Sequence, residues 1–145
     1  MLTLLKHWWN AGEEIPQHDQ KLELTVTRLM VSMMKMDDSL DQSQYDEIIR
    51  LVSNRFGITH ADAGALFHEA MVTDGKGPRF EQLAKQIKSN YNRFDLAVLL
   101  NDIWRVAEAN GQIDFYEDQF IGRISGLLGV SPEVLAEIKQ HRKAA

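Results

Sequence analysis

The feature that most constrains the fold of this chain is a turn between two helical segments that occurs twice. The first copy spans residues 36–44 (MDDSLDQSQ) and the second, 73 positions later, spans residues 109–117 (ANGQIDFYE). The register continues through Ile48 over Ile121, and after a one-residue gap residues 56–59 (FGIT) match residues 128–131 (LGVS). Self-similarity of this kind is typical of a duplicated structural unit. We therefore expect two copies of one helical hairpin.

The segment before each turn carries apolar residues at spacings of three and four, which is the period of an amphipathic helix. From Lys21 to Met36 these positions are Leu22, Val26, Leu29, Met30, Met33 and Met34. From Phe94 to Ala109 the apolar face is broader, which predicts a helix near the centre of the fold. The methionines Met30, Met33, Met34 and Met36 are interpreted as core residues, and a soft-metal or partner-binding surface is the less favoured alternative.

Capping signals predict where the helices after the two turns begin. Asp41 is followed three residues later by Gln44, and Asp114 is followed by Glu117, so that both pairs have the form of a capping box. Further helices are expected at residues 59–72, at residues 80–90 and from Ser131 onward. In the first of these, the residues expected to face inward are Ala61, Ala65 and Leu66.

No segment alternates between apolar and polar residues with a period of two, so no strand is predicted. The chain is expected to be all-α, with seven or eight helices forming one bundle-like domain over residues 1–145. Its expected parts are an N-terminal helix and linker (1–20), repeat one (21–58), intervening helices (59–90), repeat two (91–130) and a C-terminal helix (131–145).

Charge and composition exclude several classes of protein. The net charge of −5 disfavours nucleic-acid binding, and the absence of cysteine excludes disulfides and thiolate zinc sites. No apolar run reaches the roughly 20 residues of a membrane-spanning helix, and the first nine residues lack the features of a secretory signal. A cytoplasmic location is therefore expected, with the N-terminal helix docked on the core. A peripheral membrane contact through Trp8 and Trp9 is the less favoured alternative.

Acidic oxygens gather in the repeated turn, and hard divalent cations require several such oxygens around a sharp turn. If Asn110 is placed at the fifth position of a calcium loop, Gly111, Asp114 and Glu117 fall at the sixth, ninth and twelfth positions. The first position would then be Val106, which has no ligand atom, so a true EF-hand is excluded.

Two interpretations of these turns remain. In the first, Asp41, Gln44, Asp114 and Glu117 are only helix caps, each contributing about 1 kcal/mol. In the second, the two turns together bind a divalent cation (Ca, Mg, Mn or Zn). The metal ligands expected in that case are Asp37, Asp41, Asn110, Asp114 and Glu117.

At these residues the chain resembles the TerB-like proteins, the tellurite resistance protein B family, and more closely its stand-alone helical branch. The mark of that family is a twice-occurring sequence of Ala-Asp-Gly, two residues, Asp, two residues and Glu at a helix junction. The second copy here, from Ala109 to Glu117, follows this pattern, and so do the flanking segments 99–107 and 124–131. The likeness covers about residues 22–131.

The resemblance implies an all-helical, pseudo-twofold domain with a divalent-cation site, a link to tellurite, metal or general stress, and no settled catalytic activity. Related domains also occur in a membrane-anchored J-domain co-chaperone. Three signature positions differ in this chain: Asn110 stands where the family usually has aspartate, Asp38 where it has glycine, and Gln44 where it has glutamate. With these three signature positions altered, the resemblance implies a cation site that is weakened or lost, although Asp37, Asp41, Asp114 and Glu117 remain.

No enzymatic motif is present, so the chain is expected not to be an enzyme. The alternative function is a protein-protein interaction module or co-chaperone-type adaptor without a metal site. A protein partner is expected in either case, and a second copy of the chain is one candidate. A locally basic stretch offers a surface for an acidic partner or a phosphate, although a solvated face is the commoner explanation. Its cations are Lys76, Arg79, Lys85, Lys88 and Arg93.

Overall fold

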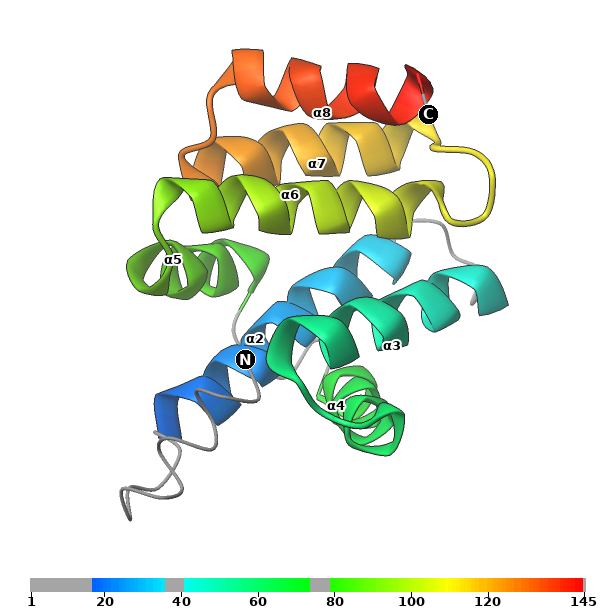
Figure 1. The fold of residues 1–145 in the computed structure, drawn as a ribbon, viewed down its shortest axis with the longest axis vertical. Helices are drawn as coiled ribbons and strands as arrows, with labels where there is room; N and C mark the ends of the chain where they lie inside the picture. Colours follow the sequence, from blue (N-terminus) through cyan, green and yellow to red (C-terminus); the bar gives the residue numbers. More distant parts are fainter. Residues whose placement is uncertain (1–16, 36–40, 74–78, 145) are drawn as a thin grey trace.

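The computed structural model describes residues 17–35, 41–73 and 79–144, together with most of their side chains. Over these residues the chain forms helices and no strand, which confirms the predicted all-α class (Figure 1). The seven helices are α2 (Gln17–Met34), α3 (Gln42–Phe56), α4 (His60–Val72), α5 (Phe80–Asn90), α6 (Arg93–Glu108), α7 (Phe115–Leu128) and α8 (Pro132–Ala144).

The helices are arranged in two groups that share one core. Figure 1 shows α6, α7 and α8 side by side in the upper part of the molecule, with α2, α3, α4 and α5 below them. Helix α2 contacts α3, α4, α5, α6 and α7, and α6 contacts α2, α3, α7 and α8. The first helix of each repeated hairpin therefore joins the two groups.

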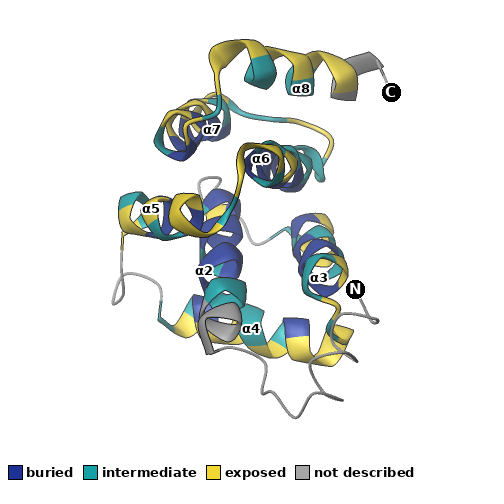
Figure 2. Ribbon diagram, turned by 60° about the vertical axis from the view of Figure 1, so that its left-hand side comes forward, coloured by how far each residue is buried: buried dark blue, intermediate teal, exposed yellow. Residues whose placement is uncertain are grey.

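Apolar residues at helical spacing supply this core. In Figure 2 the buried faces of α2, α3, α6 and α7 point toward one another, and the exposed faces point outward. Met30, Met33 and Met34 are at most 1% exposed, which confirms their assignment to the core. Met36 lies outside the described residues.

Both copies of the hairpin end in the same backbone geometry. Gly57 has φ 65° and Gly129 has φ 75°, the left-handed conformation that favours glycine. The N–H of Ile58 donates to Ser53 O at 3.2 Å, and the N–H of Val130 donates to Ser125 O at 3.0 Å. These are the matching bonds of two Schellman motifs, so the sequence repeat is also a structural repeat.

Alanine is expected to have opposite effects on stability at two glycines, one within α7 and one directly after its end. Gly129→Ala is expected to lower the free energy of unfolding by about 1–2 kcal/mol, because its φ is positive and an added Cβ would lie 3.3 Å from the Lys88 side chain. Gly122→Ala is expected to raise it by roughly 0.5–1 kcal/mol, because this exposed helical site has open space for a Cβ. Urea unfolding measures both; equal effects would contradict the backbone argument.

Two predicted details differ from the structure. Helix α2 begins at Gln17, four residues before the predicted start at Lys21. The residues between them are polar, but none breaks a helix, and the nearest proline in the sequence is Pro16. In α4, Ala61 and Ala65 are exposed and Leu66 is half-buried, whereas the buried residues are Ala63 and Ala70.

Residues 1–16, for which an N-terminal helix and the alternatives for Trp8 and Trp9 are predicted, lie outside the described residues. None of the helices in the described ranges is both long enough and apolar enough to cross a bilayer.

Candidate functional site

The two repeated turns meet at one place, through the side chains of Gln44 and Glu117. Gln44 Nε2 donates a hydrogen bond to Glu117 Oε2 at 3.1 Å and lies 3.5 Å from the carbonyl oxygen of Ala107. Gln44 is 0% exposed and Glu117 is 1% exposed. The start of α3 and the loop between α6 and α7 accordingly lie on the same side of the molecule (Figure 1). We call Asp41, Gln44, Asn110, Asp114 and Glu117 the hinge junction.

The second turn forms the capping box that the sequence predicts. Asp114 Oδ1 accepts a hydrogen bond from the N–H of Glu117 at 2.7 Å, and Glu117 Oε1 accepts one from the N–H of Asp114 at 3.2 Å. Two backbone N–H groups at the start of α7 are thereby satisfied. Glu117 thus caps its own helix with Oε1 and meets the other copy with Oε2.

The first turn forms only half of its predicted capping box. Asp41 Oδ1 accepts from the N–H of Ser43 at 2.8 Å and from the N–H of Gln44 at 3.3 Å. The Ser43 hydroxyl also donates to this carboxylate, and that bond is the main reason that the pKa of Asp41 lies below its ordinary value. The side chain of Gln44 does not return to the helix start, because it reaches across to Glu117 instead.

Asn110 lies in the loop that leads to α7. Its Oδ1 accepts a hydrogen bond from the N–H of Gln112 at 3.1 Å, and the following Gly111 has φ 93°. These features are those of a tight turn built around an Asn-Gly pair. Asp37, the fifth residue predicted to bind metal, lies outside the described residues. Of the other four, Glu117 contacts Gln44, a residue that the list of expected metal ligands did not contain, and Asp114 shares the capping box of Glu117. Asp41 and Asn110 each bond to backbone N–H groups of their own turn.

One buried atom bears on whether a cation fits here. Gln44 Oε1 is buried, and no hydrogen-bond partner for it is found among the described residues. An orphaned buried oxygen needs an explanation, and an oxygen beside a carboxylate is a suitable ligand for a hard cation. Within residues 17–35, 41–73 and 79–144, no group of three or more His, Asp or Glu side chains is placed to hold a metal ion. A site would thus need the amide oxygens of Gln44 or Asn110, or Asp37, which lies outside the described residues.

A network of charged residues lies beside the junction, between α3 and α6. Glu47 Oε1 accepts a hydrogen bond from Arg50 and lies 3.6 Å from Arg105 Nε. The same side chains line a pocket of about 470 Å³ with Ser43 and Glu108. Asp46 lines it as well, so three carboxylates and two guanidinium groups face this pocket.

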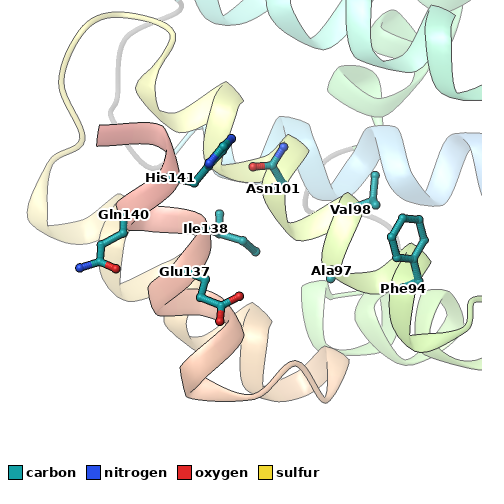
Figure 3. A pocket seen from close by; sticks show the side chains of 8 residues that line it. All are labelled: Phe94, Ala97, Val98, Asn101, Glu137, Ile138, Gln140 and His141. Carbon is teal, nitrogen blue, oxygen red and sulfur yellow. The ribbon is translucent and has the colours of Figure 1, made fainter. Parts of the chain in front are cut away.

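A second surface feature is a groove of about 1000 Å³ between α6 and α8. Figure 3 shows Phe94, Ala97 and Val98 on α6 facing the side of α8 that carries Ile138 and His141. Phe94 is 75% exposed and Val98 is 37% exposed. None of the residues that line the groove belongs to either turn. Its lining is half apolar and half polar: Phe94, Ala97, Val98 and Ile138 against Asn101, Glu137, Gln140 and His141.

Comparisons with known proteins agree with the all-α fold. Residues 23–140 match the family described as Tellurite resistance protein TerB. A crystal structure of a protein of unknown function from Porphyromonas gingivalis W83 has the same fold, with a TM-score of 0.59 and 20% sequence identity, over 81% of this chain and 88% of that chain. No curated protein matches this chain.

Proposed function

The chain belongs to the TerB family, and from this premise we propose that it is a non-enzymatic domain that binds a divalent cation at the hinge junction. The cation would link the domain to a partner in the response to tellurite, metal or general stress. This function is the one that the arrangement of the two turns supports best.

The observation that carries the proposal is the contact between Gln44 and Glu117. This contact joins equivalent positions of the two copies, so a side-chain amide and a carboxylate that are 73 residues apart in sequence lie side by side. A divalent cation needs several oxygens from a small volume, and neither turn alone supplies enough of them. The buried carboxylate of Glu117 gives the junction a negative charge that water does not solvate.

The proposed ligands are oxygens of Asp37, Asp41, Asn110, Asp114 and Glu117, and Gln44 Oε1 is added to them because it is buried without a partner. Calcium, magnesium and manganese suit such a set, because all its atoms are oxygens, and zinc suits it less. Two of these six residues are uncharged amides, so the affinity is expected to be lower than that of an all-carboxylate site.

Titration of the full chain with each cation, followed by the amide resonances, tests the proposal. We expect the resonances of residues 41–44 and 110–117 to shift at millimolar calcium or magnesium. Asp114→Asn is expected to weaken binding several-fold while α7 stays formed, because asparagine caps a helix as well as aspartate does. Glu133→Gln, in the first turn of α8, is the matched control and should bind as the parent does. Resonances of both turns that stay in place would refute cation binding.

The α6–α8 groove favours a second candidate function, a protein-binding or co-chaperone-type adaptor module without a metal site. An exposed Phe94 beside Val98 and Ile138 offers an apolar surface to a partner. On α5, Lys85 and Lys88 are also exposed. A partner whose binding ignores chelator would favour this function over the first: loss of binding in Phe94→Ala would place the contact at the groove, and loss in Lys85→Glu or Lys88→Glu would place it on α5.

A further inference from the structure

Positions 44 and 117 are equivalent in the two copies, yet they carry different residues. The duplicated register pairs Gln44 with Glu117, and the structure places these same two side chains in contact. Equivalent residues of a pseudo-twofold structure meet in this way only near its axis. The difference between the amide and the carboxylate therefore falls where the two copies face each other.

The chemistry of the contact requires such a difference. Two buried carboxylates at this distance would repel each other strongly in the interior, unless a proton or a cation lay between them. Two amides would keep a hydrogen bond but would lose its charge-assisted strength. One amide and one carboxylate give a donor, an acceptor and a single negative charge.

The Gln44 side chain makes this contact and does not cap its own helix. Asp41 caps α3 without help from Gln44, since it receives two backbone N–H groups and the Ser43 hydroxyl. In the other copy, Glu117 still returns one oxygen to the start of α7. The Gln44 side chain, which is 0% exposed, makes its best hydrogen bond across the axis.

We propose that the Gln44 amide takes the place of a cation at the axis of the duplicated hinge, so that the two halves stay joined without metal. Gln44 is thus a positioning residue, and it also sets how much a bound cation adds to the stability of the junction. The part of this proposal that concerns stabilisation by a cation rests on the proposed function. A cation that enters the junction competes with the Gln44 amide for Glu117, and the amide can respond by rotating its orphaned Oε1 toward the cation.

The test compares the full chain with three variants: Gln44→Glu, Glu117→Gln and the exchange of both residues, Q44E/E117Q. Without cation, Gln44→Glu is expected to lower the melting temperature by roughly 5–10 °C, since it puts two carboxylates at the axis. The exchanged pair again has one amide and one carboxylate, so it should recover at least half of that loss. Glu117→Gln is expected to fall between the parent and Gln44→Glu, because its amide pair is uncharged.

Melting temperatures measured with added cation distinguish this proposal from a purely structural role of Gln44, which predicts no difference between the variants in their response to cation. Millimolar calcium or manganese should raise the melting temperature of Gln44→Glu more than that of the parent or of the exchanged pair. The proposal is overturned if Gln44→Glu melts as the parent does without cation, if the exchanged pair melts as low as Gln44→Glu, or if cations raise all four proteins equally.

Failure of the proposed function looks different from failure of this inference. If the parent shows no cation-dependent shifts but Gln44→Glu is destabilised and rescued by cation, the parent does not bind cation and the role of Gln44 stands. If the parent binds cation but the exchanged pair recovers nothing, the cation site stands and the role of Gln44 falls.

Discussion

Replacing Asp102 by alanine is expected to lower the free energy of unfolding by about 3–5 kcal/mol. Asp102 on α6 forms an ion pair with Arg55 on α3, and the two side chains are only 12% and 13% exposed. Removal of the carboxylate leaves a guanidinium that is shielded from water and has lost its charged partner. Together with the more exposed Arg105–Glu47 pair, this pair ties the second helix of repeat one to the first helix of repeat two. Urea denaturation with a constant m-value measures the loss.

The matched control for Asp102 is Glu81→Ala. Glu81 pairs with Arg123 at 2.9 Å, but these side chains are 36% and 62% exposed. Water screens such a pair, so its loss is expected to cost less than about 1 kcal/mol. A similar cost for both variants would show that burial of the Arg55–Asp102 pair does not decide its importance.

Replacing Met33 by alanine is expected to lower the free energy of unfolding by about 2–5 kcal/mol. Met33 is 0% exposed in α2, the helix that contacts both groups of helices, so its truncation leaves a cavity at the centre of the fold. Met33→Leu keeps the volume and is expected to cost less than about 1.5 kcal/mol. Thermal and urea unfolding of the two variants give the comparison.

A Met33→Ala variant as stable as the parent would mean that α2 can shift to fill the space. It would also remove the main support for assigning the methionines to the core. Val72→Ala is the control on the surface, because Val72 is 56% exposed and its truncation opens no cavity.

The sequence predicted the parts of the fold that local chemistry decides. Helix ends follow from capping residues and glycines, so the start of α3 after Asp41 and its end at Gly57 agree with the structure. The core face of α2 follows from its period. In α4 this method was wrong about Ala61 and Ala65. The apolar residues of that helix are spread over several of its faces, so their spacing does not identify one buried face.

In the candidate site, too, contacts between residues close in sequence were predictable and contacts between distant residues were not. The capping role of Asp114 and Glu117 was predictable, since both partners lie within four residues. The direction of the Gln44 side chain was not, because its partner is 73 residues away and its own capping box was the nearest alternative. The repeat register held a usable signal: position 44 aligns with position 117, and equivalent positions can meet at a pseudo-twofold axis.

The unequal pair at the axis also bears on how the chain assembles. Because the two hairpins are similar, a hairpin could pair with the same hairpin of another molecule as easily as with the other hairpin of its own chain. Two first hairpins would bring amide against amide, and two second hairpins would bring carboxylate against carboxylate. Only the mixed association puts a donor opposite a charged acceptor, a preference of about 1–3 kcal/mol. The difference at this one position thereby favours pairing of the two hairpins within a single chain.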